Sequence, residues 1–171
     1  CTKDFIQELR KEGINCIHKP EQFEDIHAVL VGFDTELTYK KLEHATLLLQ
    51  NPRVHFLLTH PDKLYPSEKG FIPDAGSISL FLESVTGRKP DKIFGKPSKE
   101  MLLPLLKKYN HEEIFIVGDR LYTDKVLADS IGLDFVLVLS GETKREDVEK
   151  LEKFPALILW GLEELEEIID K

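Results

Sequence analysis

Residues 114–124 read IFIVGDRLYTD, an apolar run that ends in Gly118 and Asp119 and is followed five residues later by Asp124. The run has the length and composition of a buried β-strand, and the acidic residues come after its carboxyl end. In an open parallel sheet, ligands bind at that edge because strand ends and helix N-termini meet there. The stretch therefore predicts a parallel α/β fold with an acidic site at one sheet edge.

The two carboxylates of this stretch suit a metal site. Asp119 is placed to ligate a hard cation such as Mg²⁺, which combines carboxylate oxygen with waters and substrate phosphate. Asp124, about one helical turn further on, can orient a metal-bound water or an ammonium group. A turn at Gly118 and a helix cap at Asp119 or Thr123 is the structural alternative.

Lys96 is predicted to lie at the tip of a second strand. It belongs to the sequence KIFGKPS at residues 92–98, in which Pro97 and Ser98 indicate the start of a helix. An ammonium group beside a helix N-terminus can neutralise a phosphoryl group. The sequence therefore predicts a phosphate ligand at Lys96.

Short β-type runs alternate with helical stretches along the whole chain. This alternation is typical of βαβ units and predicts an α/β protein with a mainly parallel sheet. The predicted strands are 28–33, 54–59, 92–94, 114–117, 134–139 and 156–159. The predicted helices are 3–12, 38–50, 75–86, 98–109, 123–131, 144–152 and 161–170. We expect residues 61–76 to be a long connection and Thr143 with Glu146 to form a capping box.

The composition excludes several classes of protein. The chain has 171 residues, 23 Lys+Arg against 31 Asp+Glu, a net charge of −8 and 42% hydrophobic residues. The acidic balance argues against binding to nucleic acid or a membrane surface, and the apolar fraction argues against disorder. No apolar run approaches the roughly 20 residues of a membrane span. The only cysteines, Cys1 and Cys16, indicate neither a disulfide framework nor a zinc site, so we expect a cytoplasmic protein.

The motifs resemble those of a known family. The sequence GKPS at 95–98 followed by VGDRLYTD at 117–124 is similar to motifs three and four of the haloacid dehalogenase (HAD) superfamily of phosphatases. The segments VGFD at 31–34, TGRKP at 86–90 and VLSG at 138–141 are similar, in order and spacing, to the branch that contains nitrophenyl, pyridoxal and phosphoglycolate phosphatases. The resemblance extends over nearly the whole chain.

This resemblance implies a Rossmann-like HAD core with a large α/β cap domain. Residues 1–90 would be the cap and residues 91–171 the C-terminal half of the core. The implied activity is that of a Mg²⁺-dependent hydrolase, a phosphatase that acts on a small phosphomonoester through an aspartyl-phosphate. Its implied partner is a small phosphorylated metabolite rather than nucleic acid or membrane, and a homodimer through the cap is a further expectation.

The resemblance also assigns roles to individual residues. Asp119 would be the acidic metal ligand. Lys96 would be a catalytic and substrate-binding residue that stabilises the phosphoryl group, and Asp124 would be a catalytic residue that supports Lys96 and the water shell of the metal.

The implied cap contains candidate substrate-binding residues. Thr59, His60 and Asp62, in the sequence THPD, would contact the part of the substrate beyond phosphate. His60 stands where the family pattern has Asn, and Asp74 stands where it has Gly. Both departures leave the identity of the phosphoester open.

One part of the family's machinery is missing from the sequence. The family's nucleophile belongs to an Asp-x-Asp pair, and no such pair occurs in this chain. Because the first aspartate forms the covalent intermediate and the second transfers protons, we expect this chain alone to be inactive. The first residue is Cys1 rather than Met, which favours a truncated chain.

Two alternatives remain open at this stage. In the first, the protein is a non-catalytic relative that binds a phosphorylated ligand or a partner. In the second, it is a capless phosphatase with Asp34 as nucleophile, Glu36 as acid and Thr59 on the phosphate. The capless reading is the weaker, because Glu36 stands where an aspartate is required and Thr38 is explained as a helix cap.

Overall fold

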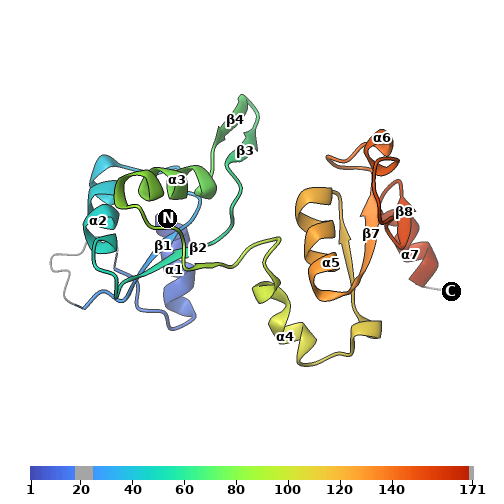
Figure 1. The fold of residues 1–171 in the computed structure, drawn as a ribbon, viewed down its shortest axis with the longest axis horizontal. Helices are drawn as coiled ribbons and strands as arrows, with labels where there is room; N and C mark the ends of the chain where they lie inside the picture. The colour runs from blue at the N-terminus through green and yellow to red at the C-terminus, as the bar shows by residue number, and fades with distance from the viewer. Residues whose placement is uncertain (18–24, 170–171) are drawn as a thin grey trace. The chain divides into compact units, whose positions relative to one another are not determined.

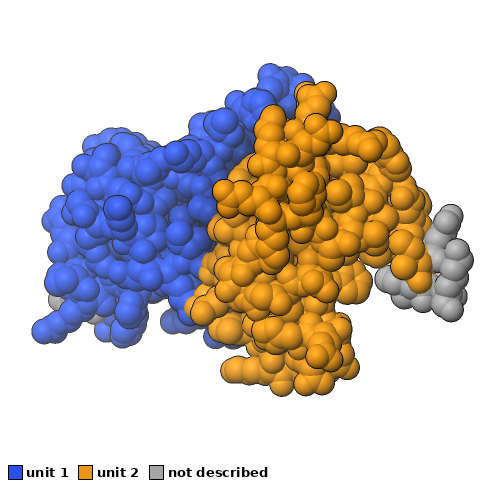
Figure 2. Space-filling view, turned by 45° about the vertical axis from the view of Figure 1, so that its right-hand side comes forward, with its two compact units in different colours: residues 1–95 blue, residues 96–171 orange. Residues whose placement is uncertain are grey.

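The computed structural model describes residues 1–17 and 25–169 of the chain (Figure 1). The chain divides into two compact units, residues 1–95 and 96–171, which Figure 2 colours separately. Each unit contains a three-stranded parallel sheet of its own. The predicted α/β class is therefore confirmed, whereas the assignment of residues 1–90 as cap and 91–171 as half of a core stays a prediction.

Unit 1 is built on a parallel sheet with two helices packed against it. The strand order is β1-β2-β5, with the bounds β1 Ala28–Val31, β2 His55–Leu58 and β5 Lys92–Ile93. The helices of the unit are α1 Lys3–Lys11, α2 Tyr39–Leu49 and α3 Ala75–Thr86. Helices α2 and α3 contact each other and the sheet, and their buried Leu49 and Leu82 pack with Phe56 in one core.

The ends of α2 and α3 follow from local chemistry. The Thr38 hydroxyl accepts a hydrogen bond from the Lys41 N–H at 3.3 Å, so Thr38 is the predicted helix cap. Helix α3 begins after Asp74, whose carboxylate accepts from the Ala75 N–H, and ends at Gly87, where φ is +69°. A left-handed backbone at that position favours glycine.

The prediction for residues 61–76 is wrong, because this segment contains a β-hairpin. Strands β3 Leu64–Ser67 and β4 Gly70–Pro73 pair in antiparallel register and project from unit 1 in Figure 1. Proline favours irregular structure in a sequence, yet Pro66 and Pro73 are tolerated here because a two-stranded ribbon leaves one edge of each strand unpaired. Gly70, with φ at +118°, permits the turn.

Unit 2 carries the second parallel sheet, in the order β6-β7-β8, with the bounds β6 Phe115–Gly118, β7 Asp134–Val138 and β8 Leu157–Leu159. Its helical segments are η1 Lys99–Leu102, α4 Leu103–Leu106, η2 His111–Glu113, the π-helical turn η3 Leu121–Lys125, α5 Val126–Ile131, α6 Arg145–Val148 and α7 Glu163–Ile169. Helix α5 packs on β7, whose Leu137 is fully buried. This core fixes the strand that precedes Asp119.

Two predicted helices of unit 2 are shorter than expected. The segment 98–109 forms a 3₁₀ turn followed by one α-helical turn, Leu103–Leu106, which has Pro104 at its start, where a helix tolerates proline. The segment 144–152 is helical only over α6. The predicted capping box of Thr143 and Glu146 is wrong, because the box lies one residue later, where the Lys144 N–H donates to the Asp147 carboxylate. Residue 170 of the predicted helix 161–170 lies outside the described residues.

Among the helices of residues 1–17 and 25–169, none has both the length and the apolar character needed to cross a bilayer.

Candidate active site

Asp119 lies directly after β6, at the carboxyl edge of the unit 2 sheet. Its Oδ2 accepts a hydrogen bond from the Glu142 N–H at 2.8 Å, and its main-chain oxygen accepts from the Thr143 N–H at 3.1 Å. The loop after β7 therefore holds Asp119 in place. Its other carboxylate oxygen, Oδ1, makes no hydrogen bond or ion pair within the described part of the chain, so it is available to a cation.

Lys96 and Asp124 form an ion pair in the same unit. Lys96 Nζ lies 2.6 Å from Asp124 Oδ1, and Asp124 Oδ2 accepts from the Arg120 N–H at 3.1 Å. The Asp124 side chain is 1% exposed, whereas that of Lys96 is 46% exposed. A buried carboxylate held at both oxygens orients the ammonium group, which stays accessible to a ligand.

Two glycines make room for these carboxylates. A Cβ added at Gly118 would lie 2.5 Å from the Cβ of Asp124, and one added at Gly141 would lie 2.5 Å from the Cβ of Asp119. Real Cβ atoms essentially never approach that closely. Neither glycine has a positive φ, so close approach rather than backbone conformation requires them.

The residues of this site fit a hydrated magnesium ion. Mg²⁺ is held in proteins by one or two carboxylates together with waters and phosphate oxygens, and Asp119 offers one oxygen of that kind. The Thr123 hydroxyl is buried beside Asp124 in the chain and has no hydrogen-bond partner among the residues that the structure describes. A buried hydroxyl of this kind is expected to meet water or a ligand.

The predicted substrate-binding residues of unit 1 lie at the carboxyl edge of its own sheet. His60 Nδ1 is 2.9 Å from Thr59 Oγ1, and His60 Nε2 is 2.9 Å from Asp74 Oδ1. One ligand atom each of His60, Asp62 and Asp74 lies within 4.8 Å of the others. The structure thus brings Thr59, His60 and Asp62 together and adds Asp74, which the sequence had marked only as a departure from the family pattern.

The carboxylate of Asp34 forms ion pairs within unit 1. Its carboxylate lies 2.8 Å from Lys41 Nζ and 3.1 Å from the N-terminal ammonium group. Burial opposes its ionisation, but hydrogen bonds from Lys41, the N-terminus and the Glu36 N–H outweigh burial and hold the pKa of Asp34 below 3.8. The strand before Asp34 pairs in the β1-β2-β5 sheet, whereas a capless site would need it in the sheet of β6. The arrangement favours a structural role for Asp34.

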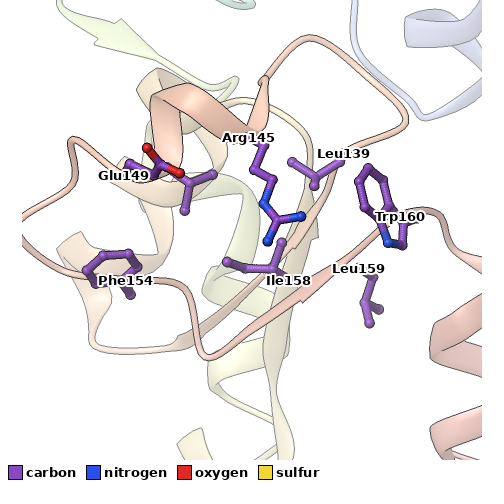
Figure 3. Close-up of a pocket in the computed structure, with 8 residues that line it drawn as sticks. Leu139, Arg145, Glu149, Phe154, Ile158, Leu159 and Trp160 are labelled. Carbon is purple, nitrogen blue, oxygen red and sulfur yellow. The ribbon is translucent and has the colours of Figure 1, made fainter.

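A cavity of about 350 Å³ lies elsewhere in unit 2 (Figure 3). Phe154, Ile158 and Trp160 line it together with Arg145 and Glu149, and it contains none of the predicted site residues. We therefore place the candidate site at Lys96, Asp119 and Asp124. Gly141 and Glu142, which support Asp119, are not predicted from the sequence, because a single sequence gives no sign that the loop after β7 contacts Asp119.

Comparison with known proteins identifies relatives of this chain. The family model for HAD-hydrolase-like proteins matches residues 93–165. A 4-nitrophenylphosphatase of Schizosaccharomyces pombe is 41% identical over 126 residues, which are 72% of this chain and 42% of that protein. A glycerol-3-phosphate phosphatase of Rattus norvegicus is 38% identical over 128 residues, which are 73% of this chain and 40% of that protein.

A solved structure extends the match to both units. The crystal structure of a 4-nitrophenylphosphatase from Thermotoga maritima has a TM-score of 0.85 and 38% sequence identity, over 97% of this chain and 62% of that chain. The chain belongs to the HAD-like hydrolases. Within them, it is similar to the phosphatases of the nitrophenyl and glycerol phosphate branch, and it spans about two fifths of the length of the two curated relatives described above.

Proposed function

We propose that this chain is part of a Mg²⁺-dependent phosphatase that hydrolyses a small phosphomonoester. The observation that carries the proposal is the ion pair between Lys96 and the buried Asp124. Asp119, five residues earlier in the chain, has an available carboxylate oxygen. A cation binds phosphoryl oxygens directly, and a metal-ligating carboxylate does so through Mg²⁺. The printed names of the relatives, which include nitrophenyl and glycerol 3-phosphate phosphatases, support the substrate class.

Each residue has a distinct task in this proposal. Lys96 binds a phosphoryl oxygen, and Asp124 holds the Lys96 ammonium in position. Asp119 holds Mg²⁺ through Oδ1. When bound, the ion offsets negative charge on the phosphoryl oxygens. The covalent aspartyl-phosphate forms on a nucleophile that the complete protein supplies, since this sequence contains no Asp-x-Asp pair.

The two parts of the chain have different roles in this proposal. Residues 91–171 supply half of the catalytic core, and residues 1–90 act as a cap whose Thr59, His60 and Asp62 contact the substrate beyond its phosphate. These three residues lie at the carboxyl edge of a parallel sheet, where ligands of α/β proteins bind. The ligand is a small phosphorylated metabolite, and the cap is the proposed face of a homodimer.

The proposal is tested by hydrolysis of 4-nitrophenyl phosphate with and without Mg²⁺. The assay compares this 171-residue chain with the complete gene product, and each with its Asp119→Asn and Asp34→Asn variants. We expect turnover by the gene product that falls about 100-fold or more in Asp119→Asn and persists in Asp34→Asn. Turnover by the 171-residue chain that vanishes in Asp34→Asn would instead make Asp34 the nucleophile of a capless phosphatase.

A non-catalytic relative that binds a phosphorylated ligand is the second candidate. The absence of an Asp-x-Asp pair favours it. It requires that neither polypeptide turns over substrate while inorganic phosphate still perturbs the NMR signals of Lys96. The same assay therefore separates the two functions.

A further inference from the structure

The cavity in unit 2 has the features of a ligand site that the proposed function does not use. Its volume of about 350 Å³ lies within the range of small-molecule sites in proteins. Its lining comes from α6 and the C-terminal end of that helix, from β8, and from the loops around them. All of these elements belong to residues 96–171, so the cavity lies within one compact unit.

Two aromatic side chains at this cavity are unusually exposed. Trp160 is 65% exposed and Phe154 is 60% exposed. Ile158, which lines the same cavity, is 40% exposed. Large apolar side chains that gather in one place and face solvent mark an interaction site. The lining therefore favours a ligand with an apolar body, and aromatic rings pack well against other rings.

Arg145 supplies a positive charge to this cavity. Figure 3 shows its guanidinium group extending from α6 toward Ile158 of β8. Within residues 1–17 and 25–169 this group makes no hydrogen bond or ion pair, so its N–H donors are available to a ligand. A guanidinium group binds a carboxylate through two parallel N–H···O hydrogen bonds. We therefore expect the apolar ligand to carry an acidic group.

Glu149 limits the charge of that ligand. Its carboxylate lines the same cavity and would repel a second negative charge. Among the described residues that line the cavity, Arg145 is the only cation. A phosphate dianion is bound by several donors, whereas one guanidinium group is enough for one carboxylate. The charges at the cavity therefore match a ligand with a single carboxylate.

The cavity also borders the segment that holds Asp119. Leu139 and Arg145 both line the cavity, and they stand at the two ends of this segment. Between them, the Glu142 N–H donates to Asp119 Oδ2 and the Thr143 N–H donates to the Asp119 main-chain oxygen. A ligand that contacts Leu139 and Arg145 would therefore restrain both ends of the segment that orients Asp119.

We propose that this cavity binds a small aromatic monocarboxylate, and that its occupation strengthens Mg²⁺ binding at Asp119. The ring packs against Phe154 and Trp160, and the carboxylate pairs with Arg145. Because the bound ligand has already restrained the segment, metal binding loses less conformational entropy. The coupling rests on the proposed function, in which Asp119 holds Mg²⁺, whereas the binding site does not.

The first test is calorimetric titration of the complete gene product with phenylacetate, in the presence of a chelator. We expect a dissociation constant below about 1 mM. Phenylethylammonium has the same ring and the opposite charge, and we expect it to bind at least about tenfold more weakly. Arg145→Gln should weaken phenylacetate about tenfold or more, the effect of lost hydrogen bonds to a charged group.

Glu149→Gln is the matched control for Arg145→Gln. It changes the other charged residue of the lining, near the same helix, and should leave phenylacetate binding equal or tighter. The 171-residue chain has one tryptophan, Trp160, so a change in its fluorescence with phenylacetate reports directly on the cavity.

Three results would overturn the binding site. These are equal affinity for phenylethylammonium and phenylacetate, unchanged affinity in Arg145→Gln, and no saturable binding of phenylacetate by the gene product at about 10 mM. The third result would overturn it even if the fluorescence of the 171-residue chain responds, because the cavity would then be closed in the complete protein.

The second test is the Mg²⁺ affinity of the gene product with and without saturating phenylacetate, measured by calorimetry. We expect about fivefold tighter Mg²⁺ binding with phenylacetate and, by reciprocity, about fivefold tighter phenylacetate binding with Mg²⁺. Asp119→Asn should abolish this mutual effect while phenylacetate still binds. An unchanged Mg²⁺ affinity would refute the coupling.

The two tests keep this inference separate from the proposed function. Mg²⁺ binding that is the same in Asp119→Asn would refute the proposed role of Asp119 and, with it, the coupling. The titrations in the presence of chelator would still decide whether the cavity binds an aromatic carboxylate through Arg145.

Discussion

Replacing Gly118 with alanine is expected to displace Asp124 from Lys96. The added Cβ would lie 2.5 Å from the Cβ of Asp124, whereas ordinary contacts begin at 3.4 Å, so the aspartate must move by about 0.9 Å. A shift of that size away from Lys96 would lengthen the 2.6 Å ion pair to about 3.5 Å, the limit of a hydrogen bond.

The expected cost is modest in stability and large in activity. Because Lys96 is 46% exposed, solvent screens the pair, and we expect the free energy of unfolding to fall by about 1–2 kcal/mol. A displacement of about 1 Å at a catalytic group costs about 100-fold in kcat. Urea unfolding of this chain measures the first quantity, and hydrolysis of 4-nitrophenyl phosphate by the gene product measures the second.

Gly132→Ala separates these two effects. Gly132 caps α5 with φ at +71°, and a Cβ there would meet no atom within 4 Å. The left-handed backbone costs alanine about 1–2 kcal/mol, similar to the loss in Gly118→Ala, without touching Asp124. Equal losses of kcat in both variants would refute the reasoning, since instability alone would then explain the loss. Full activity in Gly118→Ala would refute it as well.

Three further predictions concern other parts of the molecule. Gly141→Ala should push Asp119 out of place and weaken Mg²⁺ binding about 10- to 100-fold, measured by calorimetry on this chain; unchanged affinity would exclude Asp119 as the ligand. Asp34→Asn should lower stability by about 1–3 kcal/mol in urea unfolding, because it breaks a contact with Lys41. Because the folded pKa of Asp34 is depressed, that difference should be full above pH 3.8 and shrink as pH falls below it; a constant difference would contradict the ion pair. Leu137→Ala, at a fully buried position, should cost about 2–5 kcal/mol, and a cost below about 1 kcal/mol would place Leu137 outside the core.

The sequence predicted the elements whose apolar pattern is long and regular. Helix α3 was predicted with its observed bounds, because apolar spacing and a glycine stop agree there. The hairpin β3–β4 was missed because its strands are four residues long, contain prolines and expose most of their side chains. Its register depends on cross-strand pairing, to which no local pattern corresponds.

The sequence also predicted one contact of the candidate site. Lys96 and Asp124 were expected to cooperate, and the structure pairs them at 2.6 Å. The supports of Asp119 were beyond prediction, because Glu142 acts through its main-chain N–H and any residue but proline supplies one. Gly141 is needed because a Cβ there would clash with the Asp119 side chain. That contact depends on the pairing of β7 with β6, which the sequence does not reveal.

His60 and Asp74 illustrate how a structure changes the meaning of unusual residues. In the sequence they are two separate departures from a family pattern, fourteen residues apart. In the structure they share one 2.9 Å hydrogen bond, so each supplies what the other lacks: the carboxylate gives the ring an acceptor, and the ring satisfies a buried carboxylate oxygen. Asp74 alone would keep the hydrogen bond from the Ala75 N–H, and the partly exposed His60 alone would meet water, so the pair adds one hydrogen bond, worth about 0.5–1.5 kcal/mol. The two positions are therefore better regarded as a single change in the chemistry of this edge, from an amide side chain beside a bare helix start to an imidazole oriented by a carboxylate.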